Sequence, residues 1–169
     1  YIESLDQKVS DFYPQFGEGK GAQLTVGDLS SMSSGLDWNE KYDLSINGMM
    51  EAYITPNLDR LMLNSKIVDE PGQAFRYLSG NTQLLGMIIT KAVGKSLSDY
   101  FTEEFWQPMG AKEDALWQLD SEKNGMEKAY CCFATNARDF ARMGKLYKDY
   151  GDWNGTQLLD SAFIALSTS

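Results

Sequence analysis

The sequence contains no histidine, and this absence removes a large group of mechanisms before any motif is considered. Ser-His-Asp and Cys-His nucleophiles, zinc sites with imidazole ligands and histidine pH switches all require that side chain. The chemistry left to the chain is that of serine, lysine, tyrosine and carboxylates. We therefore expect an activity that uses no cofactor and no metal ion.

Long hydrophobic runs are also absent, and basic residues are in the minority. No apolar run approaches the roughly 20 residues that cross a bilayer, so no membrane span is predicted in this segment. Only 15 lysines and arginines stand against 24 acidic residues, which gives a formal net charge of −9 and a pI near 4.5. Such a surface repels phosphate backbones and anionic lipids. Nucleic acid is therefore excluded as an expected partner.

Cysteine is scarce, and the two that occur, Cys131 and Cys132, are neighbours. Consecutive Cα atoms lie about 3.8 Å apart, which is below the separation that disulfides prefer. We therefore interpret both residues as buried apolar side chains that carry no information about compartment. The chain opens at Tyr1 without a methionine or a basic, apolar leader, so localisation is not readable from it either.

Hydrophobic spacing in the 169 residues predicts one mainly helical domain, residues 1–169. Helices are expected at residues 25–35, 84–94, 96–108 and 136–150. Residues 44–66 are expected to form two helices, or one bent helix, interrupted at Pro56. The turn at 153–155 predicts a small hairpin, and residues 115–133 could hold short strands. In the helix at 136–150, the side chains expected to face inward are Ala137, Phe140, Ala141, Gly144 and Tyr147.

Four segments, in order, resemble the serine β-lactamase-related hydrolases, a family that includes class C β-lactamases, D-alanyl-D-alanine carboxypeptidases, esterases and 6-aminohexanoate-dimer hydrolases. They are residues 4–16, 24–36 (LTVGDLSSMSSGL), 71–86 (PGQAFRYLSGNTQLLG), and 96–110 continued by 134–144 (ATNARDFARMG). The second is similar to the family's LTVRDLLTHTSGL stretch and the last to its STARDLARFG stretch. The third matches the pattern PG-x-x-F-x-Y-S-N and is the most specific. The wording at 34–38 and 114–117 leans toward the amide hydrolases and esterases.

The resemblance implies hydrolysis of a small-molecule or peptide amide or ester through an acyl-serine. Family members use a serine, a lysine three residues later, a tyrosine and an oxyanion hole. Tyr77 falls on the catalytic tyrosine. Ser79 stands where the family has an asparagine that bonds the substrate amide, which puts β-lactam recognition in doubt. Trp38 and Trp117 are candidates to border the substrate cleft, with packing anchors as the alternative interpretation.

The family's nucleophile and oxyanion strand have no counterpart in this sequence. No lysine follows a serine by three positions, and no Lys-Thr-Gly strand is present. The resemblance then places the nucleophile before Tyr1 and the oxyanion strand after Ser169. The chain is expected to be the helical subdomain of the β-lactamase/transpeptidase-like fold, with a few short strands or hairpins, and to be inactive alone.

Two other functions stay open at this point. The parent protein could be a catalytically dead relative that binds peptidoglycan or a protein partner. Alternatively, the chain could be a free-standing helical interaction domain with accidental similarity. A Ser-x-x-Lys encoded upstream of Tyr1 would favour the enzyme. Family relatives are often exported, so the resemblance favours the bacterial periplasm or cell envelope, and it leaves the oligomeric state open.

Overall fold

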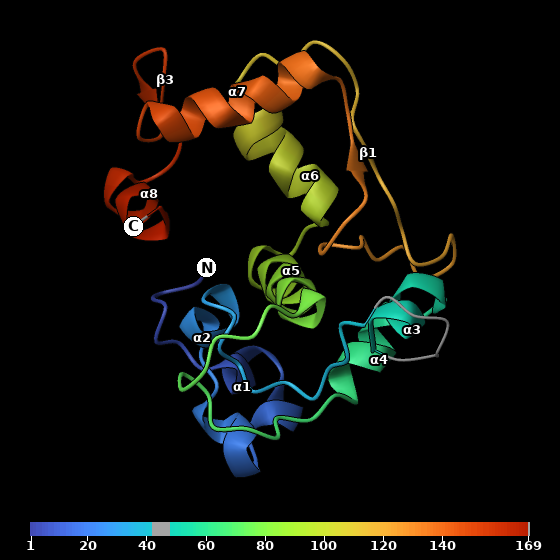
Figure 1. Ribbon diagram of the computed structural model, residues 1–169. Helices are drawn as coiled ribbons and strands as arrows, with labels where there is room; N and C mark the ends of the chain where they lie inside the picture. The colour runs from blue at the N-terminus through green and yellow to red at the C-terminus, as the bar shows by residue number, and fades with distance from the viewer. Residues whose placement is uncertain (42–47, 169) are drawn as a thin grey trace. The chain divides into compact units, whose positions relative to one another are not determined.

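The computed structural model describes residues 1–41 and 48–168, and it divides the chain into two compact units (Figure 1). The first unit consists of Tyr1–Leu97 and Gln118–Cys132. The second consists of Ser98–Trp117 and the chain from Phe133 onward. Each unit has its own hydrophobic core. Among the described residues, no helix is both long and apolar enough to span a membrane.

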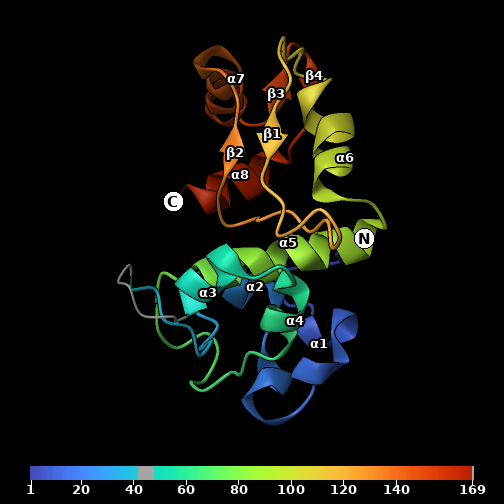
Figure 2. The same cartoon turned by 90° about the vertical axis from the view of Figure 1, so that its right-hand side faces the viewer.

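The first unit is organised around its longest helix, α5. Its helices are α1 (Val9–Phe12), α2 (Val26–Ser30), α3 (Gly48–Ile54), α4 (Leu58–Leu63) and α5 (Ser79–Val93), with short 3₁₀ turns at Pro14–Phe16 and Gly19–Gln23. Helices α1 to α4 each pack against α5, and Figure 2 shows α5 crossing the unit. The core is therefore formed between α5 and these short helices. Its largest fully buried side chains include Leu29, Leu58 and Leu84.

Local signals in the sequence predict several helix ends in this unit correctly. Helix α2 begins with a capping box, in which Thr25 Oγ1 accepts the Asp28 N–H at 3.1 Å and Asp28 Oδ2 accepts the Thr25 N–H at 2.9 Å. The helix starts where the sequence predicts but ends at Ser30, before the predicted end at residue 35. Helices α3 and α4 are separate on the two sides of Pro56, which is the first of the two predicted alternatives, although residues 44–47 of that prediction lie outside the described residues. Helix α5 ends at Gly94, which has φ 72°.

Helix α5 begins five residues earlier than the sequence predicts, at Ser79 instead of residue 84. The first turns of α5 bury polar side chains: Asn81 is 0% exposed and Gln83 is 1% exposed. Asparagine and glutamine are polar residues, so buried ones do not contribute to a hydrophobic pattern in the sequence. The 3.6-residue hydrophobic period of this helix can therefore be recognised only from Leu84 onward.

The second unit combines helices with two short antiparallel strand pairs. Its elements are α6 (Leu97–Phe101), which leads into a π turn at Thr102–Trp106, β1 (Leu116–Trp117), β2 (Phe133–Ala134), α7 (Ala137–Lys148), β3 (Asp152–Trp153), β4 (Thr156–Gln157) and α8 (Ser161–Ser167). Figure 2 shows β1 beside β2, with Trp117 opposite Phe133. Strands β3 and β4 form the predicted hairpin, whose turn residues Asn154 and Gly155 both have positive φ. The mainly helical expectation is confirmed.

Helix α7 has the predicted cap, but the prediction of its inward face is wrong. Asn136 Oδ1 accepts the Asp139 N–H at 2.9 Å, which begins the helix as expected. Phe140 and Tyr147, however, are 46% and 40% exposed, and the fully buried side chains are Asp139 and Leu146. The buried face of α7 differs from the predicted face because the helix buries the hydrogen-bonded carboxylate of Asp139. A hydrophobic pattern cannot reveal a buried carboxylate.

The interpretation of the cysteines is also wrong, because Cys131 and Cys132 form a disulfide with each other. Their Cα atoms are 3.7 Å apart, as adjacent residues must be. A disulfide between adjacent residues is excluded when their side chains point in opposite directions, as they do in a strand. Here Cys132 has φ 69°, and this left-handed residue turns the two side chains to the same side. Both cysteines are half-buried.

Candidate functional site

Tyr77 lies two residues before the start of α5, and its exposed side chain is followed by two buried residues. Its side chain is 61% exposed, whereas the next two residues, Leu78 and Ser79, are 3% and 4% exposed. Within residues 1–41 and 48–168, no hydrogen bond is formed by its hydroxyl. The phenol is therefore placed at the start of a rigid helix with its polar atom available.

The loop that carries Tyr77 is held by backbone hydrogen bonds to the segment after α2. The Arg76 N–H donates to Met32 O at 2.7 Å, and the Gly72 N–H donates to Ser33 O at 2.8 Å. Gly35 has φ 70°, and a Cβ at this position would overlap the carbonyl oxygen of Asp69. Only glycine combines this conformation with so close an approach. The Ser-Gly sequence after α2 thus fixes the loop before Tyr77.

Ser34 and Asn81 connect this turn to α5 inside the protein. Ser34 is 1% exposed, and its hydroxyl donates to Asn81 Oδ1 while it accepts the Leu36 N–H at 3.1 Å. The amide of Asn81 also faces the Met32 sulfur at 3.5 Å. Ser34 therefore serves the structure, and Asn81, which is fully buried, does not offer its amide at the surface.

Ser79 belongs to a second buried network, with Trp38 and Glu40. Its hydroxyl accepts the Trp38 Nε1–H at 3.1 Å and donates to Glu40 Oε2 at 3.0 Å. The same Glu40 oxygen accepts the Ser79 backbone N–H at 2.8 Å. Two of the sequence-predicted site residues, Trp38 and Ser79, are thus brought into direct contact two residues after Tyr77. The single hydroxyl proton of Ser79 faces two acceptors inside the protein, Glu40 Oε2 and the Met49 sulfur at 3.3 Å.

Glu40 is the functional-site residue that sequence reasoning missed. Leu78, the N-cap of α5, makes no side-chain cap hydrogen bond, so an orphan N–H at this helix start needs another acceptor. The Glu40 carboxylate supplies it from 39 positions away, and a negative charge is favourable at a helix N-terminus. The leucine cap was the one signal that an acceptor had to come from elsewhere.

A cavity of about 310 Å³ lies beside the loop that carries Tyr77. Its lining includes Leu78 and Arg76, the two neighbours of Tyr77 in sequence, together with Asp69. Arg76 Nη2 and Asp69 Oδ2 are 3.2 Å apart, and both side chains are more than half exposed. The cavity beside this loop therefore has a mixed lining that includes charges of both signs.

Trp117 lies in the second unit, within a cluster of aromatic rings. Its ring packs edge-on against Phe133 at 5.3 Å and against Phe101 at 6.4 Å between centroids. These rings, with Trp106, line a cavity of about 290 Å³. Trp117 is half-buried, so it is a packing residue with one accessible side. Its contact with a substrate stays a prediction.

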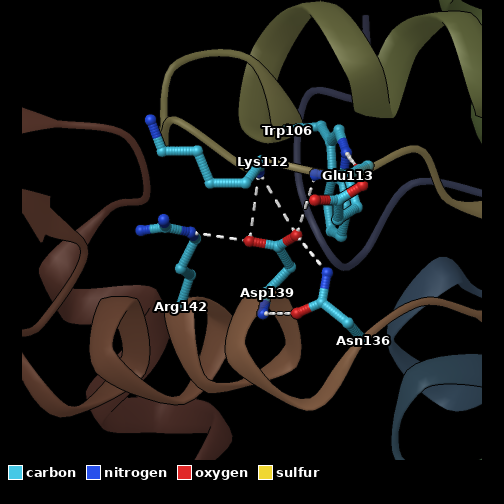
Figure 3. A network of polar contacts seen from close by, with 6 residues as sticks. All are labelled: Trp106, Lys112, Glu113, Asn136, Asp139 and Arg142. Carbon is cyan, nitrogen blue, oxygen red and sulfur yellow. Dashed lines mark hydrogen bonds and ion pairs between the residues drawn. The ribbon is translucent and has the colours of Figure 1, made fainter.

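Asp139 is the centre of the most extensive polar network in the second unit (Figure 3). Its carboxylate accepts the backbone N–H groups of Lys112 and Glu113, each at 3.2 Å, Asn136 Nδ2 at 2.6 Å and Arg142 Nε at 2.8 Å. Burial raises the pKa of Asp139, but these hydrogen bonds outweigh it and hold the pKa at about 2. The carboxylate is a structural anchor that ties the 112–113 loop to α7.

Comparison with known proteins decides the family. The beta-lactamase family model matches residues 2–162. The chain belongs to the beta-lactamase family. This match also sets aside the interpretation of an unrelated helical interaction domain.

The relatives of this family member are considerably longer than the chain. It is 29% identical over 118 residues to the D-aminopeptidase of Brucella ovis, which covers 68% of the chain and 22% of that protein. Among solved structures it resembles a Bacillus anthracis protein assigned as a 6-aminohexanoate-dimer hydrolase, with a TM-score of 0.80, 23% identity, and coverage of 96% of the chain and 45% of that protein. A Bacteroides dorei protein assigned as a beta-lactamase follows at 0.74 and 20%, covering 96% and 47%. The chain thus spans less than half of each of these relatives.

Proposed function

We propose that this beta-lactamase family chain is the tyrosine-bearing part of a serine hydrolase that cleaves an amide or an ester through an acyl-serine intermediate. The observation that carries the proposal is Tyr77: its exposed phenol occupies the tyrosine position of the family motif, directly before a helix whose first residues are buried. The hydrolase names of the relatives support the same class of reaction.

The proposed mechanism assigns Tyr77 the transfer of one proton in each half-reaction. A serine of a Ser-x-x-Lys helix, supplied by a longer chain, loses its proton to the tyrosine oxygen as it attacks the carbonyl carbon. The phenol then returns that proton to the leaving group, and the cycle reverses when water attacks the acyl-serine. Proton transfer through a phenol near neutral pH needs an ammonium group beside its oxygen. The lysine of the same motif fills that role, so the 169 residues alone are inactive.

Ser79 shapes the substrate preference in this proposal. Its proton faces two acceptors inside the protein, Glu40 and the Met49 sulfur, and one of its lone pairs accepts from Trp38, so it can offer a substrate only a hydrogen-bond acceptor. The family's asparagine offers a donor as well. Esters and linear amides, which need fewer contacts at this position than the side-chain amide of a β-lactam, are therefore the preferred substrates. Contact of the substrate with Trp38 and with Trp117 is a further part of this proposal.

A fluorophosphonate probe, which reacts with activated serines, tests the proposal. The 169-residue chain is expected to remain unlabelled, and a longer product of the same gene that includes Ser-x-x-Lys is expected to gain one probe per molecule by intact mass. Stoichiometric labelling of the 169-residue chain would contradict the assigned mechanism. A longer product without Ser-x-x-Lys, or one that stays unlabelled, would instead point to a non-catalytic binding protein.

The role of Ser79 has its own test in the longer product. Ser79→Asn should raise kcat/KM for nitrocefin by about tenfold, the equivalent of one recovered hydrogen bond of about 1.4 kcal/mol. Hydrolysis of p-nitrophenyl acetate should stay within about twofold, and Ser30→Asn, at the exposed last residue of α2, serves as the control. An unaltered protein that already hydrolyses nitrocefin efficiently would show that serine at this position does not weaken β-lactam recognition.

A further inference from the structure

The disulfide between Cys131 and Cys132 lies where the chain passes from the first unit to the second. The first unit ends at Cys132 and the second resumes at Phe133, while the returning strand crosses in the same way between Trp117 and Gln118. The Gln118 N–H donates to Cys132 O at 3.1 Å, so the two crossing segments are joined at this residue. The disulfide closes a small covalent ring from two adjacent residues, and this disulfide ring is next to the hydrogen bond between Gln118 and Cys132.

The turn before the disulfide is held from one side by α5. Gln83, which is 1% exposed, accepts the Ala129 N–H at 2.8 Å and donates to the Glu127 carbonyl at 3.1 Å. The Cys131 N–H continues this turn by donating to the Lys128 carbonyl at 3.0 Å. Immediately after the disulfide, the Phe133 ring packs edge-on against neighbouring aromatic rings. The disulfide therefore occupies a short stretch between two well-anchored segments.

The ring and the backbone conformation of Cys132 depend on each other. In an extended strand, successive side chains point to opposite faces, so two adjacent sulfurs cannot meet. The left-handed φ of 69° at Cys132 brings them together, and β2 consequently begins only at Phe133. This conformation is uncommon for a residue with a side chain, and in the described residues it otherwise occurs outside glycine at Met32, Tyr150 and Asn154. The S–S bond holds Cys132 in this conformation, and its loss leaves Cys132 free to return to an ordinary conformation.

We propose that Cys131 and Cys132 form a reversible redox site whose oxidation state sets the conformation of residues 127–132. Its co-reactant is a dithiol reductant. One thiolate of the reductant attacks a sulfur of the pair, the S–S bond breaks, and a mixed disulfide forms. The second thiol of the reductant then displaces the protein sulfur. Two electrons and two protons pass to the pair, which becomes a dithiol, while the reductant leaves as a cyclic disulfide.

Two features make the pair suitable for this exchange. Both cysteines are half-buried, so neither residue is enclosed in a hydrophobic core. The two thiols formed remain on adjacent residues, so reoxidation closes the same ring without a search for a distant partner. This inference concerns the 169 residues themselves and does not depend on the proposed hydrolase activity.

The experiment combines intact mass with amide hydrogen exchange on the folded 169-residue chain, with and without dithiothreitol. Reduction in the absence of denaturant should add about 2 Da and expose two thiols to alkylation. Exchange at the amides of Gln118 and Cys131, whose hydrogen bonds end on this turn, should become at least about tenfold faster, while amides in the middle of α5 should not change. Reoxidation should restore both values.

Two variants separate the ring from the conformation that it imposes. Cys132→Gly cannot form the ring but accepts a positive φ freely, so its Gln118 amide should be as protected as in the oxidised protein, with or without reductant. Cys132→Ala should exchange like the reduced protein under both conditions. The proposal is overturned if two free thiols persist under oxidising conditions, if reduction requires denaturant, if reduction leaves exchange unchanged, or if the glycine and alanine variants behave alike.

Discussion

Replacing Gln83 with leucine tests how the first unit holds residues 127–132. Gln83 lies in α5 and is 1% exposed, and its amide bonds two backbone groups that are 44 and 46 positions away, the Glu127 carbonyl and the Ala129 N–H. Leucine fills a similar volume, so little cavity is created. Both backbone groups nevertheless lose their partner. A buried polar group without a partner costs about 1–3 kcal/mol.

Gln83→Leu should lower the free energy of unfolding by about 2–4 kcal/mol, because two backbone groups lose their partner. The cost stays below the full sum for two groups because Ala129 is half-buried, so its N–H can form a hydrogen bond with water instead. Urea unfolding of the oxidised chain, followed by far-UV circular dichroism, measures this as a lower midpoint at an unchanged m-value. Gln15→Leu, at an exposed glutamine, should change stability by less than about 0.5 kcal/mol. A loss below about 1 kcal/mol for Gln83→Leu would refute the assignment of these two bonds as anchors.

Three further predictions concern stability. The pKa of Asp139 is lowered from 3.8 to about 2, so the contribution of this carboxylate to folding stability is complete above about pH 4 and is lost as the pH falls toward 2. The urea midpoint should therefore fall more between about pH 5 and about pH 3 in the wild type than in Asp139→Asn. Equal falls in the two proteins would contradict this prediction. Gly35→Ala should cost at least about 1–2 kcal/mol, from the left-handed conformation alone, and a loss under about 0.5 kcal/mol by the same assay would show that the loop readily adjusts. Tyr77→Phe should leave the midpoint unchanged, since its exposed hydroxyl bonds no described residue; a clear drop would indicate a structural role.

Sequence alone predicts the features of this chain that depend on neighbouring residues. The capping box at Thr25, the stop at Gly94 and the turn at Asn154 each follow from local conformational preference, and each is present. The early start of α5 could not be found this way, because its first turns bury amides such as Asn81 that have no hydrophobic signature.

Features that depend on distant partners are the ones that sequence reasoning missed. Glu40 caps α5 across 39 positions, and the buried face of α7 is set by Asp139, which bonds residues 112 and 113. The Cys131–Cys132 disulfide is missed for a different reason, because its partners are adjacent and their Cα separation of 3.7 Å is the one that the sequence implies. The left-handed conformation of Cys132, which the sequence does not reveal, turns the two side chains to the same side. The motif around Tyr77 was recognised as a pattern, but the hydrogen bond from Ser79 to Glu40 required coordinates.

The measurement that tests the central claim most directly is the acylation rate of a Tyr77→Phe variant in the longer gene product that carries Ser-x-x-Lys. Tyr150→Phe is the matched control, because the two tyrosines are 61% and 60% exposed. Rapid-mixing kinetics with p-nitrophenyl acetate should show acylation at least about 10²-fold slower for Tyr77→Phe, the contribution of a positioned acid or base, and unchanged for Tyr150→Phe. Wild-type acylation rates in both variants, at unchanged melting temperature, would contradict the assignment of Tyr77 as the proton carrier.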